Sequence, residues 1–98
     1  MAHTVVRDYE RTHGGTYVES VTIIRTDAGA YPSEWNYSLH YGKIGGATLL
    51  RYDNAHEQEK GHERHTPDGT ESIEFPGMEG LYRRFRRKIV TLPPCDTQ

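Results

Sequence analysis

One amphipathic helix near the end of the chain limits how this protein can fold. Apolar and aromatic side chains recur there at helical spacing: Met78, Leu81, Tyr82, Phe85 and Ile89. Spacings of three and four residues place them on one side of a helix, and basic side chains cover the remaining arc. Pro76 favours a helix start, and Pro93-Pro94 ends the helix. Because this helix carries a continuous apolar stripe, we expect it to pack on a sheet.

The chain before this helix predicts the strands of that sheet. Strand patterns occur in four segments: Thr4–Arg11, Tyr17–Arg25, Trp35–Tyr41 and Ala47–Tyr52. Gly14-Gly15 and Gly45-Gly46 suit the turns between them. A short edge strand is considered at Glu71–Phe75, and a fifth strand at His62–His65. We therefore expect an α+β fold: an antiparallel sheet of four to five strands with one C-terminal amphipathic helix packed on one face.

The length of 98 residues allows one hydrophobic core of modest size. We expect a single domain over residues 1–98, with its core at about 4–92 and a flexible tail at 93–98. The only cysteine, Cys95, cannot form an internal disulfide, which fits a reducing cytoplasm. No apolar run approaches the length of a membrane span, so we expect a cytoplasmic protein without membrane contact.

Charge is distributed unevenly along the chain. Residues 1–80 contain 7 basic and 13 acidic side chains, whereas residues 81–98 contain 5 basic and 1 acidic. The predicted helix is therefore a basic element on an acidic body. Such a surface attracts phosphate or an acidic protein, and charge alone does not distinguish the two.

The segment from Leu49 to His65 contains the candidate functional residues. Three of the six histidines lie there within ten residues, at positions 56, 62 and 65. Other polar residues accompany them: Asp53, Asn54, Lys60 and Arg64. An apolar core does not require this cluster, so we expect the chemistry of the protein to lie here.

Metal binding is one interpretation of the cluster. His56, His62 and His65 could bind zinc with Asp53 as a fourth ligand. However, no cysteine joins them, the spacing matches no common structural zinc pattern, and Lys60 and Arg64 would bring positive charge to a cation. We therefore expect no metal and no other cofactor.

Metal-free cleavage of RNA is a second interpretation. This reaction needs a base for the 2′-hydroxyl, a cation for the phosphate and an acid for the departing 5′-oxygen. Histidine can serve as base or acid near neutral pH, and arginine can bind the phosphate. If residues 62–65 are extended, His62 and Arg64 share one face and His65 lies on the other; a tight turn would bring all three together.

A third interpretation gives the histidines no chemistry. They would then be polar loop residues of a small binding module. His40 is interpreted in the same way, because strand alternation places it on the face opposite Leu39 and Tyr41, toward solvent.

Parts of this segment resemble the TumE family of toxin–antitoxin systems. The similarity lies in the runs Arg51-Tyr52-Asp53-Asn54 and Lys60-Gly61-His62-Glu63-Arg64-His65, followed by a helix with Leu81 and Phe85. It covers residues from about Val21 to Ile89, although the spacer between the runs carries extra acidic residues. The resemblance implies a toxin that is neutralised by a cognate antitoxin protein, with RNA as its target.

Together, the residues and the resemblance predict the toxin of a type II system that is a metal-independent endoribonuclease. His62 or His65 would act as base and acid, Arg64 would stabilise the phosphate, and Asp53 would orient a histidine. Further substrate-binding residues are expected at Tyr52, Asn54, Lys60, Arg83, Arg84 and Arg87. A homodimer is possible. The alternative is a non-catalytic nucleic-acid-binding or regulatory module that uses the basic C-terminal helix.

Overall fold

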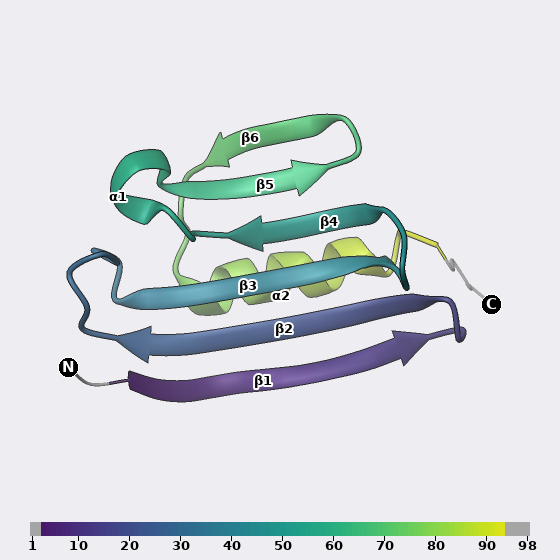
Figure 1. Ribbon diagram of the computed structural model, residues 1–98, viewed down its shortest axis with the longest axis horizontal. Helices are drawn as coiled ribbons and strands as arrows, with labels where there is room; N and C mark the ends of the chain where they lie inside the picture. The colour runs from purple at the N-terminus through teal and green to yellow at the C-terminus, as the bar shows by residue number, and fades with distance from the viewer. Residues whose placement is uncertain (1–2, 94–98) are drawn as a thin grey trace.

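Six strands form one antiparallel sheet in a computed structural model that describes residues 3–93. Each strand pairs with the next along the chain, so the sheet order is the chain order (Figure 1). The strands are β1 (His3–His13), β2 (Tyr17–Thr26), β3 (Trp35–Lys43), β4 (Thr48–Asp53), β5 (His62–Thr66) and β6 (Gly69–Ile73). Sequential antiparallel pairing needs only short connections, which suits a chain of this length.

Helix α2 (Met78–Ile89) lies behind the sheet in Figure 1, across its central strands. It buries the stripe formed by Met78, Leu81, Phe85 and Ile89. The sheet contributes the other side of the core through Val21, Ile23, Tyr37, Leu39, Tyr41, Leu50 and Tyr52. In β2, β3 and β4 these residues alternate with more exposed ones, because successive side chains of a strand point to opposite faces. The face opposite α2 is therefore available for polar residues, and we call it the open face.

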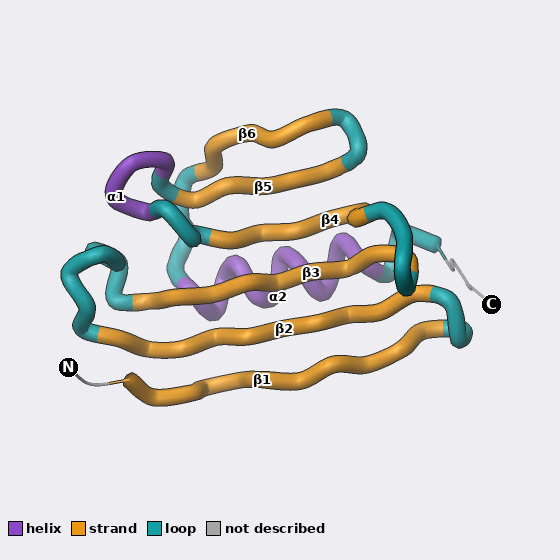
Figure 2. The backbone as a smooth tube through the Cα atoms, in the orientation of Figure 1, coloured by secondary structure: helices purple, strands orange, loops and turns teal. Residues whose placement is uncertain are grey.

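A four-residue helix, α1 (Glu57–Lys60), joins β4 to β5 (Figure 2). It ends at Gly61, whose φ of 66° is a left-handed conformation that glycine adopts without steric cost. The chain then reverses and pairs β5 with β4, so that Asp53 lies directly opposite Glu63.

The predicted number of strands and helices is wrong. The sheet has six strands instead of four to five, and the short α1 adds a second helix where a polar loop was expected. Strand β5 lacks an alternating apolar pattern, and all five of its residues are half-buried. Pairing with β4 and β6 stabilises β5. Such pairing cannot be inferred from the spacing of apolar residues in the sequence.

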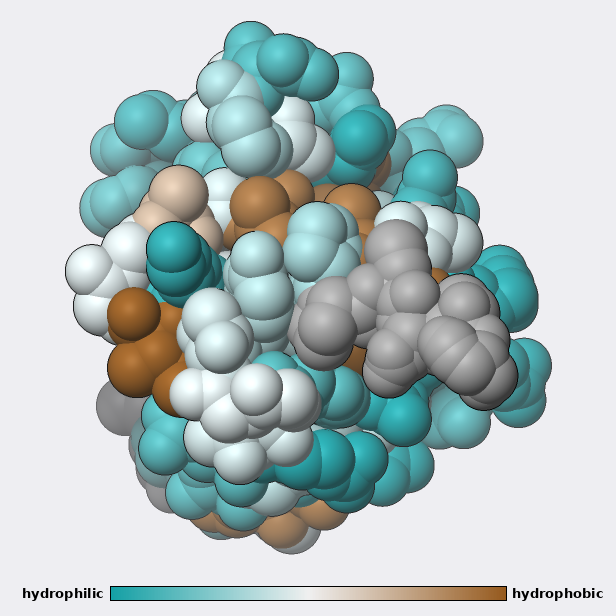
Figure 3. All heavy atoms as spheres, turned by 90° about the vertical axis from the view of Figure 1, so that its right-hand side faces the viewer, coloured by the Kyte–Doolittle hydropathy of each residue, from teal (hydrophilic) through white to brown (hydrophobic). Residues whose placement is uncertain are grey.

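The end of the sheet that holds the β1–β2 and β3–β4 turns has a mixed surface. Figure 3 shows this end as mainly polar, with hydrophobic side chains in separate small patches.

No helix within residues 3–93 is long and apolar enough to cross a membrane. Most of the tail expected at 93–98, including Cys95, lies outside the described residues.

Candidate functional site

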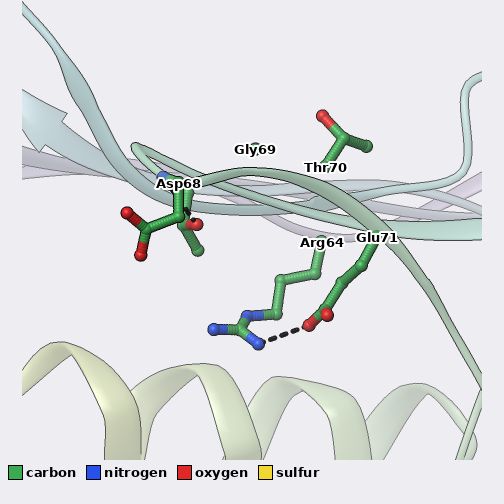
Figure 4. A pocket seen from close by; sticks show the side chains of 6 residues that line it. Arg64, Asp68, Gly69, Thr70 and Glu71 are labelled. Carbon is green, nitrogen blue, oxygen red and sulfur yellow. Dashed lines mark hydrogen bonds and ion pairs between the residues drawn. The ribbon is translucent and has the colours of Figure 1, made fainter.

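Strand β5 divides the predicted catalytic residues between the two faces of the sheet. Its extended backbone places His62 and Arg64 on the side of α2, because Arg64 lies opposite the core residue Tyr52. His65 is paired with Arg51 and points to the open face. The close-up view agrees: Arg64 extends toward α2, whereas Thr70, the partner of His65 on β6, points away from it (Figure 4). The structure therefore does not bring His62, Arg64 and His65 together.

His62 makes the contacts of a structural residue. Its Nδ1 lies 2.8 Å from the hydroxyl of Tyr37, and its ring stacks on Phe75 with 4.3 Å between centroids. Its Nε2 lies 3.5 Å from a carboxylate oxygen of Glu57. Burial lowers the pKa of His62, although Glu57 opposes this shift. The imidazole thus joins β3, α1 and the segment after β6 inside the protein.

Asn54 and Tyr52, two of the predicted substrate-binding residues, are also buried. Asn54 accepts a hydrogen bond from the backbone N–H of Tyr37 at 3.0 Å and donates one to the carbonyl of Trp35 at 2.6 Å. Tyr52 is 1% exposed and packs edge-on against Phe85 of α2. Neither side chain is available to a substrate on the open face.

Arg64 lines a cavity formed by the β5–β6 hairpin. Its guanidinium donates to the carboxylate of Glu71, and the two side chains point toward one another in Figure 4. The cavity has a volume of about 270 Å³ and is lined by Arg64, Thr66, Asp68, Gly69, Thr70 and Glu71. The guanidinium of Arg64, which was expected to stabilise the substrate phosphate, is therefore paired with the carboxylate of Glu71.

A row of polar residues crosses the open face instead. His40 on β3 is opposite Arg51 on β4, Arg51 is opposite His65 on β5, and His65 is opposite Thr70 on β6. Neighbouring strands are about 4.8 Å apart, so the two histidines flank the arginine at Cα distances of about 5 Å on each side. Two imidazoles with a guanidinium between them are thus presented on one face.

Asp53 connects the members of this row. Its Oδ2 lies 3.1 Å from Nε2 of His65 and 3.1 Å from Nε of Arg51. The other ring nitrogen of His65, Nδ1, lies 3.0 Å from the hydroxyl of Thr70. These contacts hold the imidazole of His65 and the guanidinium of Arg51 beside each other.

His40 has a different environment from His65. Burial, and to a smaller extent the positive charge of Arg51, lowers the pKa of His40 below its ordinary value. The neutral form of His40 is therefore favoured at neutral pH. The interpretation of His40 as a solvent-facing residue stays a prediction. Because the side chain is half-buried beside Arg51, His40 is also a candidate for the site.

The predicted substrate-binding cations lie away from this row. Lys60 is exposed on α1, and Arg83 and Arg87 are exposed on α2, on the other side of the sheet. Arg84 is half-buried on the same helix. These roles remain predictions, and the geometry excludes a common phosphate for Arg87 and Arg51.

A second polar cluster fixes α2 to the first two strands. The fully buried carboxylate of Glu19 receives hydrogen bonds from Tyr9, from Arg86 at 2.6 Å and, through Nε2, from His13 at 2.9 Å. Burial alone would raise the pKa of Glu19, but these three hydrogen bonds lower it below its ordinary value. Arg86, one of the basic residues of the helix, is therefore engaged in an intramolecular ion pair, with its side chain 37% exposed.

Potential metal ligands also occur on the open face. Asp53, Glu63 and His65 offer ligand atoms that lie within 4.8 Å of one another, and they are the one such group found within residues 3–93. The set that the sequence suggested does not form there, because His62 is on the other face.

Three residues of the open face were not selected from the sequence: Arg51, His40 and Glu63. Alternation within each strand indicates the face on which each side chain lies. Which residues lie beside it follows only from the register of β3, β4 and β5.

A family model described as toxin TumE matches residues 3–92. Searches among curated proteins and among solved structures found no match.

Proposed function

Because the chain belongs to the TumE family of toxins, we propose that it is the toxin of a type II toxin–antitoxin pair and acts as a metal-independent endoribonuclease. The row of His40, Arg51 and His65 on the open face is the observation that supports this proposal. Cleavage of RNA without a metal requires a base, a cation and an acid near one phosphate, and the row contains side chains suited to all three roles.

His40 is the general base in this proposal. Its lowered pKa keeps the imidazole neutral near pH 7, so it can accept the proton of a ribose 2′-hydroxyl. The 2′-oxygen then attacks the adjacent phosphorus atom. Arg51 lies next to His40 and donates hydrogen bonds to the phosphate oxygens, on which negative charge increases during the attack.

His65 is the general acid and, in its protonated form, donates a proton to the departing 5′-oxygen. The P–O5′ bond breaks, which leaves a 2′,3′-cyclic phosphate on one fragment and a 5′-hydroxyl on the other. Asp53 orients the ring of His65 through the 3.1 Å contact to Nε2. Nδ1 lies 3.0 Å from the hydroxyl of Thr70, and it exchanges this contact for the departing 5′-oxygen when the substrate is bound. His62 and Arg64 act as positioning residues on the other face, where they hold β5 in place.

The exposed cations of α2 are proposed to bind the antitoxin rather than the cleaved RNA. Arg83, Arg87 and Lys88 are exposed on the helix. The row of His40, Arg51 and His65 lies on the face opposite the core residues that α2 buries. An acidic segment of an antitoxin would complement this surface. The antitoxin would then neutralise the toxin either without contacting the open face or by extending around the edge of the sheet to reach it.

The test is an RNA cleavage assay with purified protein in the presence of a chelator, together with growth after induced expression. We expect His40→Gln and His65→Gln each to lower the cleavage rate by about 100-fold or more. The matched control is His56→Gln, because His56 is an exposed histidine of the same segment that lies outside the row. Cleavage by His40→Gln and His65→Gln at the rate of the control would refute the assignment.

A non-catalytic nucleic-acid-binding module is the alternative, and the exposed Arg83, Arg87 and Lys88 favour it. It predicts binding of RNA or DNA that weakens steeply with salt, without any cleavage product. Substituting Arg87 and Lys88 by Gln would then reduce the binding, whereas His65→Gln would leave it unchanged.

A further inference from the structure

We infer that Asp53, Glu63 and His65 form a binding site for a divalent transition-metal cation, best suited to Zn²⁺, whose occupancy inhibits the protein. Binding of the cation follows from the three side chains themselves. Only the inhibitory part rests on the ribonuclease function proposed above, because it involves the same imidazole.

The two carboxylates of the site are held side by side by the sheet. Asp53 and Glu63 are directly paired across β4 and β5, and both face away from α2. Like charges at opposite positions of an antiparallel pair destabilise it unless a cation compensates them. Their oxygen atoms and a nitrogen of His65 lie within 4.8 Å of one another, a separation that one ion can bridge.

The imidazole of His65 is oriented as a ligand. Its Nε2 lies 3.1 Å from Asp53 and 3.7 Å from Glu63, yet within residues 3–93 this buried atom has no partner in hydrogen-bonding geometry. Its Nδ1 contacts the hydroxyl of Thr70 at 3.0 Å. When Nδ1 donates its proton to Thr70, Nε2 presents a lone pair between the two carboxylates. This is the usual arrangement of a metal-binding histidine, whose other nitrogen is held by a neighbouring acceptor.

Arg51 competes with the cation for one oxygen of Asp53. Its Nε lies 3.1 Å from Oδ2, the same atom that contacts His65. The side chain of Arg51 is 45% exposed, so it can turn into solvent when a cation arrives. The other oxygen, Oδ1, accepts the backbone N–H of Ala55 at 3.3 Å and keeps the carboxylate in place. Displacing Arg51 makes binding weaker than in a preformed structural zinc site.

The ligand set favours zinc over magnesium. One imidazole nitrogen and two carboxylate oxygens match the ligands that Zn²⁺ accepts, and three protein ligands leave one coordination position open. Mg²⁺ prefers oxygen ligands in octahedral geometry and seldom uses histidine. Among abundant divalent ions, affinity for such a nitrogen-containing site rises toward zinc.

A bound cation would prevent the proposed chemistry in two ways. An imidazole that coordinates through Nε2 cannot also take up the second proton that a general acid must donate. The cation would also displace Arg51 from Asp53 and remove the contact that orients His65. Zinc would therefore inhibit cleavage, and a chelator would restore it.

The first test measures Zn²⁺ binding to the chelator-treated protein by titration calorimetry, independently of any activity. We expect one equivalent to bind, with affinity lowered about 10-fold or more in Glu63→Gln and about 100-fold in His65→Ala. The control His56→Gln should bind like the wild type, because His56 is exposed and its ring nitrogens are not among the grouped ligand atoms. A wild type that binds no Zn²⁺, or a Glu63→Gln variant that binds as tightly as the wild type, would overturn the site.

The second test measures RNA cleavage with and without Zn²⁺, with each protein compared with its own zinc-free rate. The wild type should lose most of its rate when zinc is saturating, and Glu63→Gln should need about 10-fold more zinc for the same inhibition. Zinc binding in a protein that cleaves no RNA would refute the proposed function while preserving the site. Zinc binding that leaves cleavage unchanged would refute only the inhibition.

Discussion

The amide of Asn54 is expected to stabilise the protein rather than to bind substrate, and Asn54→Ala tests this. The side chain is 1% exposed and joins three segments of the chain. It accepts from the N–H of Tyr37 and donates to the carbonyl of Trp35 and to a carboxylate oxygen of Glu57, the last at 2.8 Å. The substitution removes all three hydrogen bonds and changes nothing on the open face.

The size of the effect follows from the groups that remain. The N–H of Tyr37 would lose its partner in a buried position, which costs about 1–3 kcal/mol. The carbonyl of Trp35 keeps a long contact of 3.5 Å from the hydroxyl of Ser33, and Glu57 keeps its hydrogen bonds from Ser33. We therefore expect a loss of about 2–4 kcal/mol in the free energy of unfolding, which lowers the Tm by about 10–25 °C in a domain of this size.

Urea unfolding followed by circular dichroism and by the fluorescence of Trp35 measures this loss. The neighbouring substitution Asp53→Asn is the comparison, because its side chain faces the opposite side of the sheet. The carboxylate itself is 9% exposed, and its partners Arg51 and His65 are 45% and 32% exposed. We expect Asp53→Asn to cost about 1–2 kcal/mol, less than Asn54→Ala, and to reduce RNA cleavage. If Asn54→Ala unfolds within 1 kcal/mol of the wild type, roughly the size of one net hydrogen bond, the structural role is refuted.

Three further substitutions test the packing of the sheet and of α2. Gly42→Ala should destabilise the protein by about 1–3 kcal/mol in urea, because its Cβ would lie 2.7 Å from the carbonyl oxygen of Ala47. Phe85→Ala should cost about 3–5 kcal/mol in the same assay, since this side chain is fully buried. Glu19→Gln should be less stable than the wild type at pH 7. Because the pKa of Glu19 is lowered in the folded protein, its contribution is present above the ordinary carboxyl range, and the difference should shrink as the pH falls through the lowered value. A constant difference between pH 7 and pH 3 in thermal unfolding would contradict that last expectation.

The sequence predicted the strands whose apolar residues alternate and the helix with an apolar stripe. In β3 the buried residues Tyr37, Leu39 and Tyr41 share the face opposite His40, as alternation within the predicted strand Trp35–Tyr41 requires. α2 spans Met78–Ile89, and its buried residues are those of the predicted stripe apart from Tyr82. Such patterns are local, because burial on one face repeats with the period of the element itself.

A strand was considered at His62–His65, but periodicity could establish neither β5 nor helix α1. In the run from His62 to Thr66 every residue is half-buried, so no period distinguishes a strand from a loop. The strand depends on partners elsewhere in the chain: the hydroxyl of Tyr37, the ring of Phe75 and the backbones of β4 and β6. Contacts of this kind are visible only once the chain is folded.

Alternation within strands also explains why the two runs that resemble the TumE family do not place all their side chains on one face of the sheet. Tyr52 and Asp53 are consecutive in β4, so they must point to opposite faces, and Asn54 turns inward where the strand ends. The same geometry separates His62 from His65 in β5. A run of adjacent polar residues in a strand therefore provides only half of its side chains to any one substrate. The other half of a site must come from neighbouring strands, as His40 of β3 does in the proposed row, so roles in this protein are better assigned by face and register than by position in the run.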